Sequence, residues 1–317
     1  MVHEDMRASI GVVQGVVPFL CRFGLIGATV MFYAVLEPVR AQVVIPVAQP
    51  DRLEVPNDET DPRAPDQTRE KPEDLGRVIE ETRAALARNP DNAELRFQLA
   101  FALASRGDID EAIKEYHAVI AREPGHVWAR NNLGVLYAKK GLYDEAIGKF
   151  GEALFRDPQH QASRFNSGLT FLKIGEVDAA VRQFHLLLKT NPKHVGAIVN
   201  LGKILFDRGE VDQAIDHYRK AIAIDPKFGP GHRYLANSLM KKGDTAGAIA
   251  EYRLAVGLMP QDSLLRYEFA QALDAEGEQT EAVRELRQFL KLHSERPDQQ
   301  AMRQGAEAQL RALGATP

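Results

Sequence analysis

The chain has few of the features that mark enzymes, metal proteins or nucleic-acid-binding proteins. It has one cysteine, Cys21, in 317 residues, so no disulfide can form within the chain. The motifs GxxxxGKS/T, GxGxxG, HExxH, CxxC and GxSxG are absent, and each would have indicated a phosphate, dinucleotide, zinc, redox or serine-nucleophile site. The formal net charge is only −4, which does not favour nucleic acid as an electrostatic partner. We therefore expect no catalytic residue, no cofactor, no metal and no nucleic-acid partner.

What the chain has instead is a period of 34 residues. Three kinds of residue keep this step without an insertion: Pro90, Pro124, Pro158, Pro192, Pro226 and Pro260; Gly107, Gly141, Gly175, Gly209, Gly243 and Gly277; Ala112, Ala146, Ala180, Ala214, Ala248 and Ala282. A fixed period of this length is typical of proteins in which one supersecondary unit is copied and stacked.

Each unit has the pattern of two helices. With the proline at position 32, six repeats span 93–126, 127–160, 161–194, 195–228, 229–262 and 263–296. Positions 4, 7, 8 and 11 share one face of a first helix, and positions 20, 21, 24, 27 and 28 share one face of a second. Position 8 is always Gly or Ala, and position 24 is Tyr, Phe or Leu. Small residues at 8 and 20 would let the two helices approach closely, so we predict an all-α solenoid of stacked helix pairs.

The turn residues agree with this division. The glycine at position 15 is expected to end the first helix in a left-handed conformation. Position 18 is predicted to be the N-cap of the second helix, because it holds Asp110, Asp144, Asp178, Asp212 and Thr280. Ala246 breaks that row, so the second helix of repeat five is expected to have the weakest cap. Position 4 is unusual, since its arginines, whose stems we expect to snorkel, replace a bulky apolar residue: Arg96, Arg130, Arg164 and Arg266.

These residues resemble the tetratricopeptide repeat family over about two-thirds of the chain. The resemblance implies a right-handed superhelix, whose first helices line a concave groove that binds extended peptide segments. It also implies a protein that is not an enzyme. Some members of the family clamp a C-terminal carboxylate, but Glu268 stands where that clamp needs an asparagine, so this function is not carried over.

The array has visible ends. Residues 73–92 match the second helix of an earlier copy and are predicted to form a half-repeat that opens the stack. Residues 297–317 are predicted to form a capping helix and tail, which solenoids need for solubility. Residues 42–72 contain six prolines, seven acidic and four basic residues, so they are predicted to be a disordered linker.

Residues 1–41 are predicted to be a signal peptide or a membrane anchor. The stretch from Phe23 to Leu36 is apolar without a charge, and Val39 and Ala41 suit a signal-peptidase cut before Gln42. The alternatives are an uncleaved span over roughly 10–36, with Pro18 and Arg22 inside it, or translation from a later start. Cleavage or anchoring would place the repeats outside the cytoplasm, in the periplasm or at the inner membrane, with membrane contact only through an uncleaved N-terminal segment.

The candidate binding residues lie on the predicted first-helix face. Asn132, Asn166 and Asn200 occupy position 6 of three successive repeats, and an amide can bond a peptide backbone as both donor and acceptor. Apolar residues beside that row would form a binding patch, and four lysines would put positive charge at its edge, at Lys139, Lys173, Lys203 and Lys241. The apolar neighbours are Trp128, Phe101, Val135 and Leu169, flanked by Phe97, Asn131 and Phe165. The alternative for each is an ordinary role in packing or on a solvated surface.

The sequence thus predicts an adaptor or scaffold without catalytic activity, which binds an extended protein segment and helps to assemble a bacterial cell-envelope complex. The alternatives are a non-catalytic subunit of an envelope enzyme or secretion machine, or a homo-oligomeric structural protein. His126, His160 and His194 also recur every 34 residues, but helices about 10 Å apart would keep them too far apart to share a metal. We interpret them as polar turn residues.

Overall fold

The computed structural model describes residues 72–292 and 300–316. All of them belong to one compact unit, Val47–Pro317; the other unit, Met1–Pro46, lies outside the described residues. The predictions made for 1–41 and for the linker up to Lys71 also lie outside them.

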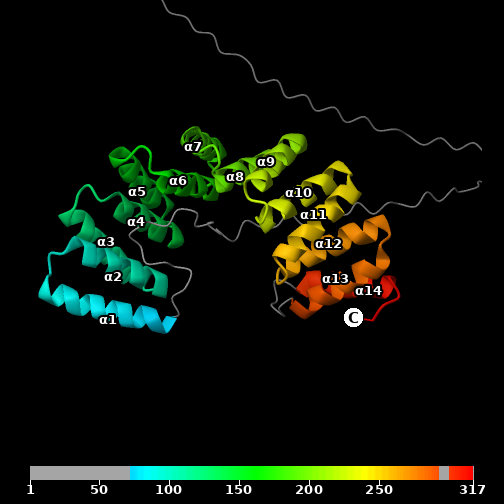
Figure 1. Cartoon of the computed structure of the whole chain (residues 1–317), viewed down its shortest axis with the longest axis horizontal. Coiled ribbons are helices and arrows are strands. Elements are labelled where there is room, and N and C mark those ends of the chain that lie inside the picture. The colour runs from blue at the N-terminus through cyan, green and yellow to red at the C-terminus, as the bar shows by residue number, and fades with distance from the viewer. Residues whose placement is uncertain (1–71, 293–299, 317) are drawn as a thin grey trace, which may run out of the picture. The chain divides into compact units, whose positions relative to one another are not determined.

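The described residues form fourteen α-helices and no strand (Figure 1). In chain order they are α1 (Pro72–Arg88), α2 (Ala93–Arg106), α3 (Ile109–Arg122), α4 (Val127–Lys139), α5 (Tyr143–Arg156), α6 (Gln161–Lys173), α7 (Val177–Thr190), α8 (Val195–Asp207), α9 (Val211–Ile224), α10 (Gly229–Lys242), α11 (Thr245–Leu258), α12 (Ser263–Glu276), α13 (Gln279–Leu292) and α14 (Gln300–Ala312). Six pairs, from α2–α3 to α12–α13, stand between the single helices α1 and α14. The predicted all-α solenoid is confirmed.

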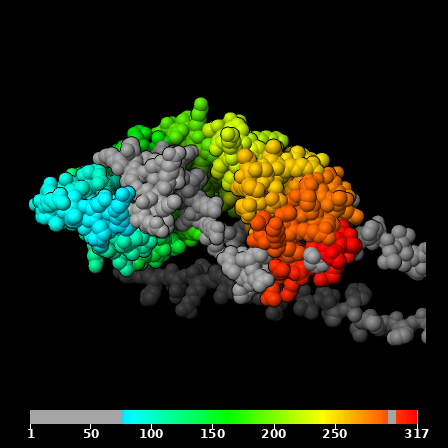
Figure 2. Space-filling model, turned by 60° about the horizontal axis from the view of Figure 1, so that its bottom comes forward, coloured from blue at the N-terminus to red at the C-terminus, as the bar shows by residue number. Residues whose placement is uncertain are grey.

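Stacking is local and continuous along the array. Each helix packs against the next one in the chain, from α1 on α2 to α13 on α14. First helices of neighbouring repeats also touch, since α2 contacts α4, α4 contacts α6, and α8 contacts α10. In the space-filling view the colours of the described residues run in chain order, from cyan to red (Figure 2). Residues at the same position of successive first helices therefore lie in neighbouring places on one side of the stack.

In repeats two to four, the two helices meet where the glycine at position 8 lies against the ring at position 24. A Cβ atom on Gly134 would lie 2.6 Å from Cε1 of Phe150, and one on Gly168 would lie 2.6 Å from Cε1 of Phe184. Both rings are buried. Carbon atoms pack at about 3.5–4.0 Å, so only glycine fits under these rings with the helices this close. The sequence prediction of close approach at position 8 is confirmed.

The first helices end as predicted, but the second helices begin earlier than predicted. The six position-15 glycines have φ between 77° and 99°, which is the left-handed region. The N-caps of α3, α5, α7 and α9 are at position 16 and form no side-chain cap bond. The position-18 acids lie instead in the first turn of the helix, where their negative charge interacts favourably with the helix dipole. Asp244 caps α11 by accepting from the Gly247 amide at 2.9 Å, so the expectation of a weak cap there was wrong.

Three of the first helices are capped by histidine. Nδ1 of His126, His160 and His194 accepts a hydrogen bond from the backbone amide three residues later, at 3.1, 3.2 and 3.1 Å. Asn92 and Asp262 cap α2 and α12 in the same way, at 2.9 Å each. The regular spacing of these histidines therefore follows from their use as caps, which the sequence interpretation had missed.

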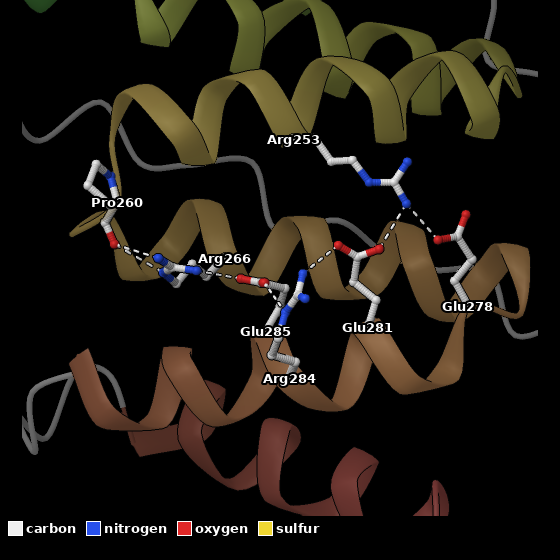
Figure 3. A network of polar contacts seen from close by, with 7 residues as sticks. All are labelled: Arg253, Pro260, Arg266, Glu278, Glu281, Arg284 and Glu285. Carbon is white, nitrogen blue, oxygen red and sulfur yellow. Dashed lines mark hydrogen bonds and ion pairs between the residues drawn. The ribbon is translucent and has the colours of Figure 1, made fainter.

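The arginines at position 4 bond the loops between repeats. Arg266 donates to the Pro260 carbonyl at 2.9 and 3.1 Å and to Glu285 of α13 at 2.5 Å (Figure 3). Arg96 makes the same two contacts, to the Pro90 carbonyl and to Glu115. Each head group is thus held by the preceding loop and by the second helix of its own repeat, rather than reaching to water as expected.

The tight contact at position 8 makes a testable prediction about stability. Gly168→Ala should destabilise the array by about 1–3 kcal/mol, because its new methyl group would collide with Phe184. Gly148→Ala on α5 is the matched control. A Cβ there meets nothing within 4 Å, so it should stabilise by about 0.5–1 kcal/mol. Urea unfolding followed by circular dichroism measures both, and equal effects would contradict the close contact.

Candidate functional site

The predicted asparagine row lies on three first helices. Asn132, Asn166 and Asn200 are half-buried on α4, α6 and α8. Nδ2 of Asn132 donates to Oη of Tyr116 at 3.2 Å, and Nδ2 of Asn200 donates to the Gly196 carbonyl of its own helix at 2.8 Å. Each amide nitrogen carries two protons, so Asn132 and Asn200 each have a second N–H beyond the bond named here. Whether the row binds a peptide stays a prediction.

Asn131 lies inside the array, where it links two repeats. Only 4% of its surface is exposed. Its Oδ1 accepts from Nδ2 of Asn166 at 3.1 Å and from Oγ of Ser163 at 3.2 Å, and its own Nδ2 donates to Oδ1 of Asn132 at 3.1 Å. The expected surface position of Asn131 is therefore corrected, because position 5 faces the first helix of the next repeat. It also means that Asn132 and Asn166 are parts of a structural network.

The phenylalanines expected beside the row belong to the core. Phe97, Phe101 and Phe165 are 1%, 8% and 4% exposed. The ring of Phe97 stacks on His126 with 4.7 Å between centroids, and that of Phe165 lies 4.8 Å from His194. Aromatic side chains at position 5 thus pack against the capping histidine of the same repeat, which removes them from solvent. The expectation of an exposed patch is corrected for these three residues.

Trp128, Val135 and Leu169 remain half-buried. The Trp128 ring meets His160 edge to face, with 4.4 Å between centroids and 83° between planes. The same tryptophan borders a hollow of about 360 Å³, which lies between the loops that precede α4 and α6. Its lining comprises Glu123, Gly125, His126, Val127, Trp128, Asp157 and His160. The indole of Trp128 and the two carboxyl groups of Glu123 and Asp157 border this hollow.

The lysines on the first helices differ in what surrounds them. Lys139 is exposed and Lys173 is half-buried. Nζ of Lys203 lies 5.4 Å above the Tyr234 ring, and Nζ of Lys241 lies 4.3 Å above the ring of Phe206. These cation–π contacts orient both ammonium groups without neutralising them.

Asp207 shares the surroundings of these two lysines. Burial raises its pKa, while Lys203 and Lys241 act in the opposite direction. Sequence reasoning missed that Asp207 interacts with these two lysines. Its position in the repeat, 13, does not reveal this, because three other repeats have lysine there.

In repeats five and six, an ion pair joins two first helices, from Arg233 on α10 to Glu268 on α12. Nε and Nη2 of Arg233 donate to the two Glu268 oxygens at 2.7 and 2.8 Å, and Nη1 donates to Asp262 at 3.1 Å. Burial would lower the pKa of Arg233, but Glu268 and Asp262 together raise it. Asn237 is also engaged, since its Oδ1 accepts from the Tyr252 hydroxyl. The guanidinium of Arg233 is thus paired within the chain by two carboxylates.

Residues 72–292 and 300–316 offer neither a grouping of metal ligands nor a helix suited to span a membrane. No three of the His, Cys, Asp and Glu side chains there are grouped so as to hold a metal ion. None of the described helices combines the length and the apolar character that a membrane span needs.

Comparison with known proteins identifies the repeats. Two family models, each described as tetratricopeptide repeat, match residues 79–116 and 98–161 in one case and 197–228 in the other. Among curated proteins, no sequence matches this chain.

Similar solved structures show the same fold. PilF of Pseudomonas aeruginosa has 16% identity and a TM-score of 0.60, over 69% of this chain and 99% of that one. A tetratricopeptide repeat protein of Parabacteroides merdae has 19% identity and a TM-score of 0.58, over 74% and 93%. The Cut9–Hcn1 hetero-tetramer of APC/C matches at 15% identity and a TM-score of 0.61, over 73% and 46%. At these identities the likeness concerns the fold alone.

The Arg233–Glu268 pair predicts strong coupling. Glu268→Leu alone leaves a largely buried guanidinium without its main partner and should cost about 3–5 kcal/mol. Arg233→Met should cost a similar amount, because it leaves the carboxylate of Glu268, which is only 5% exposed, without its cation. The double variant should recover most of the loss, since an apolar pair replaces the ion pair. Denaturant unfolding of the four proteins measures this, and additive losses would show that the pair is not coupled.

Proposed function

Because the chain belongs to the tetratricopeptide repeat family, we propose that it is a non-catalytic scaffold, which binds an extended protein segment along its first helices. The observation that carries the proposal is the row of half-buried polar side chains on α4, α6, α8 and α10, among them Asn200, Lys203 and Tyr234. First helices stack at about 10 Å, and an extended peptide advances about 3.3 Å per residue. Every third residue of the segment would therefore meet a new repeat.

The charge on this face favours an acidic segment. Lys139, Lys173, Lys203 and Lys241 lie on first helices of repeats two to five, with Asp207 as the acid among them. Lys203 and Lys241 are held over aromatic rings, so a carboxylate of the partner would meet cations that are already oriented. We expect Trp128 and its hollow to take one side chain of the same segment.

We further propose that the protein is exported and serves the assembly of a bacterial cell-envelope complex. The support is the apolar stretch from Phe23 to Leu36 and the small residues before Gln42.

The first-helix site makes a prediction about affinity. Partners captured from envelope extracts by the full chain are identified, and the acidic segment that binds is measured by fluorescence anisotropy. Lys203→Glu with Lys241→Glu should weaken binding at least about tenfold at low ionic strength, and added salt should shrink the difference. Asn200→Ala should cost about 1 kcal/mol in affinity, without lowering the melting temperature, because Asn200 bonds only its own helix.

The matched control is Lys220→Glu, at an exposed position of the second helix α9. It should bind the same segment as the unchanged protein does. Unaltered affinity in the Lys203 and Lys241 variant and in the Asn200 variant would show that the first helices are not the binding site.

Export makes a separate prediction. The mature protein purified from its native host should begin at Gln42, as read by N-terminal sequencing. An intact Met1 with the repeats open to protease added to spheroplasts would mean an uncleaved anchor. An intact Met1 with protected repeats would overturn the proposal of export.

A further inference from the structure

One edge of the array carries a ladder of ion pairs between repeats. The side chain at position 14, just after a first helix, reaches the position-18 aspartate of the preceding repeat. This pairing joins Lys140 to Asp110 at 2.6 Å, Arg208 to Asp178 at 2.9 Å and Lys242 to Asp212 at 2.6 Å. The ammonium of Lys140 lowers the pKa of Asp110. The same geometry thus recurs at three of the junctions between repeats.

The ladder is broken at the junction of repeats two and three. Position 14 of repeat three is Ile174, so Asp144 lacks the cation that its three counterparts have. Among the residues that the structure describes, no ion pair reaches Asp144. At the junction of repeats five and six, both members of the pair are replaced. Position 14 of repeat six is Glu276, and position 18 of repeat five is Ala246, so no aspartate is left without a cation there. Only the break at Ile174 leaves an aspartate without its bridge.

A second exception coincides with the first. Position 16 is acidic in five repeats, at Asp108, Glu176, Glu210, Asp244 and Glu278, but in repeat two it is Leu142. Leu142 and Ile174 are 38% and 39% exposed. Leu142 lies in the turn between α4 and α5, and Ile174 lies in the turn between α6 and α7. Such turns form the edge that carries the ladder. Single exposed apolar residues are common, but here two of them replace charges at one junction.

We propose that Leu142, Ile174 and Asp144 form a docking edge for a protein segment that presents a lysine or arginine directly beside an apolar side chain. The cation would take the place on Asp144 that Lys140, Arg208 and Lys242 occupy at the other junctions. The apolar neighbour would cover Leu142 and Ile174. This edge lies in the helix-connecting turns, so it is separate from the first-helix face and takes a partner of opposite charge.

The test selects random twelve-residue peptides displayed on phage against the immobilised full chain, and measures the best synthetic peptide by titration. The selected peptides should carry Lys or Arg next to Leu, Ile or Phe. Ile174→Lys restores the ladder, so it should lower affinity about tenfold or more while leaving the melting temperature unchanged or higher. Asp144→Lys should lose the basic peptides and select acidic ones. Lys242→Ala, at a junction without the apolar pair, is the matched control and should bind as the unchanged chain does.

Several results would overturn the proposal. One is wild-type affinity in both Ile174→Lys and Asp144→Lys. Another is selected peptides that depend on Asn200 and Lys203, which would support the first-helix face alone. Light scattering that shows a dimer abolished by Ile174→Lys would assign the edge to a second copy of the chain. A synthetic peptide of residues 42–71 that binds with the same dependence on Ile174 would assign it to the chain's own N-terminal segment.

Discussion

The close contact between the glycine at position 8 and the ring at position 24 is the constraint on which the central repeats, two to four, depend. At Gly168 the backbone of α6 lies so near the Phe184 ring that a methyl group would not fit. This contact sets the distance between the two helices of a repeat. Because the unit has the same length each time, the pairs stack on one another in a regular way. The periodic sequence thus becomes a periodic structure.

Polar contacts between repeats follow from that regular geometry. A histidine at position 34 caps the next first helix, as His126 does for α4. An arginine at position 4, such as Arg266, joins a loop carbonyl to a glutamate of the second helix. A cation at position 14 reaches the preceding aspartate, as Lys140 does. Each is a modest interaction alone, but all lie at the borders between units, where a solenoid must hold its neighbours in register.

Departures from such a repeated pattern are informative, because the other copies show what the position does by default. Ile174 and Leu142 stand out only when compared with the charged residues at the same positions elsewhere. Glu268 shows the opposite case, since it departs from the family pattern but its carboxylate is bonded to Arg233 within the chain. The departures at Leu142 and Ile174 leave apolar side chains exposed where the other repeats have charges. The departure at Glu268 completes an ion pair within the chain.

The sequence by itself determined the repeat length, the helix pairs and the glycine turns, because these depend on spacing and on local backbone preference. It could not decide which side chains of a first helix face water. Asn131 and Phe165, at position 5, were expected at the surface and are buried, because the neighbouring repeat covers them. The bond from Asn166 to Asn131 likewise required two repeats to be placed side by side. Helical periodicity gives the direction of a side chain around one helix, but burial depends on what lies against that helix, and only the tertiary structure decided that.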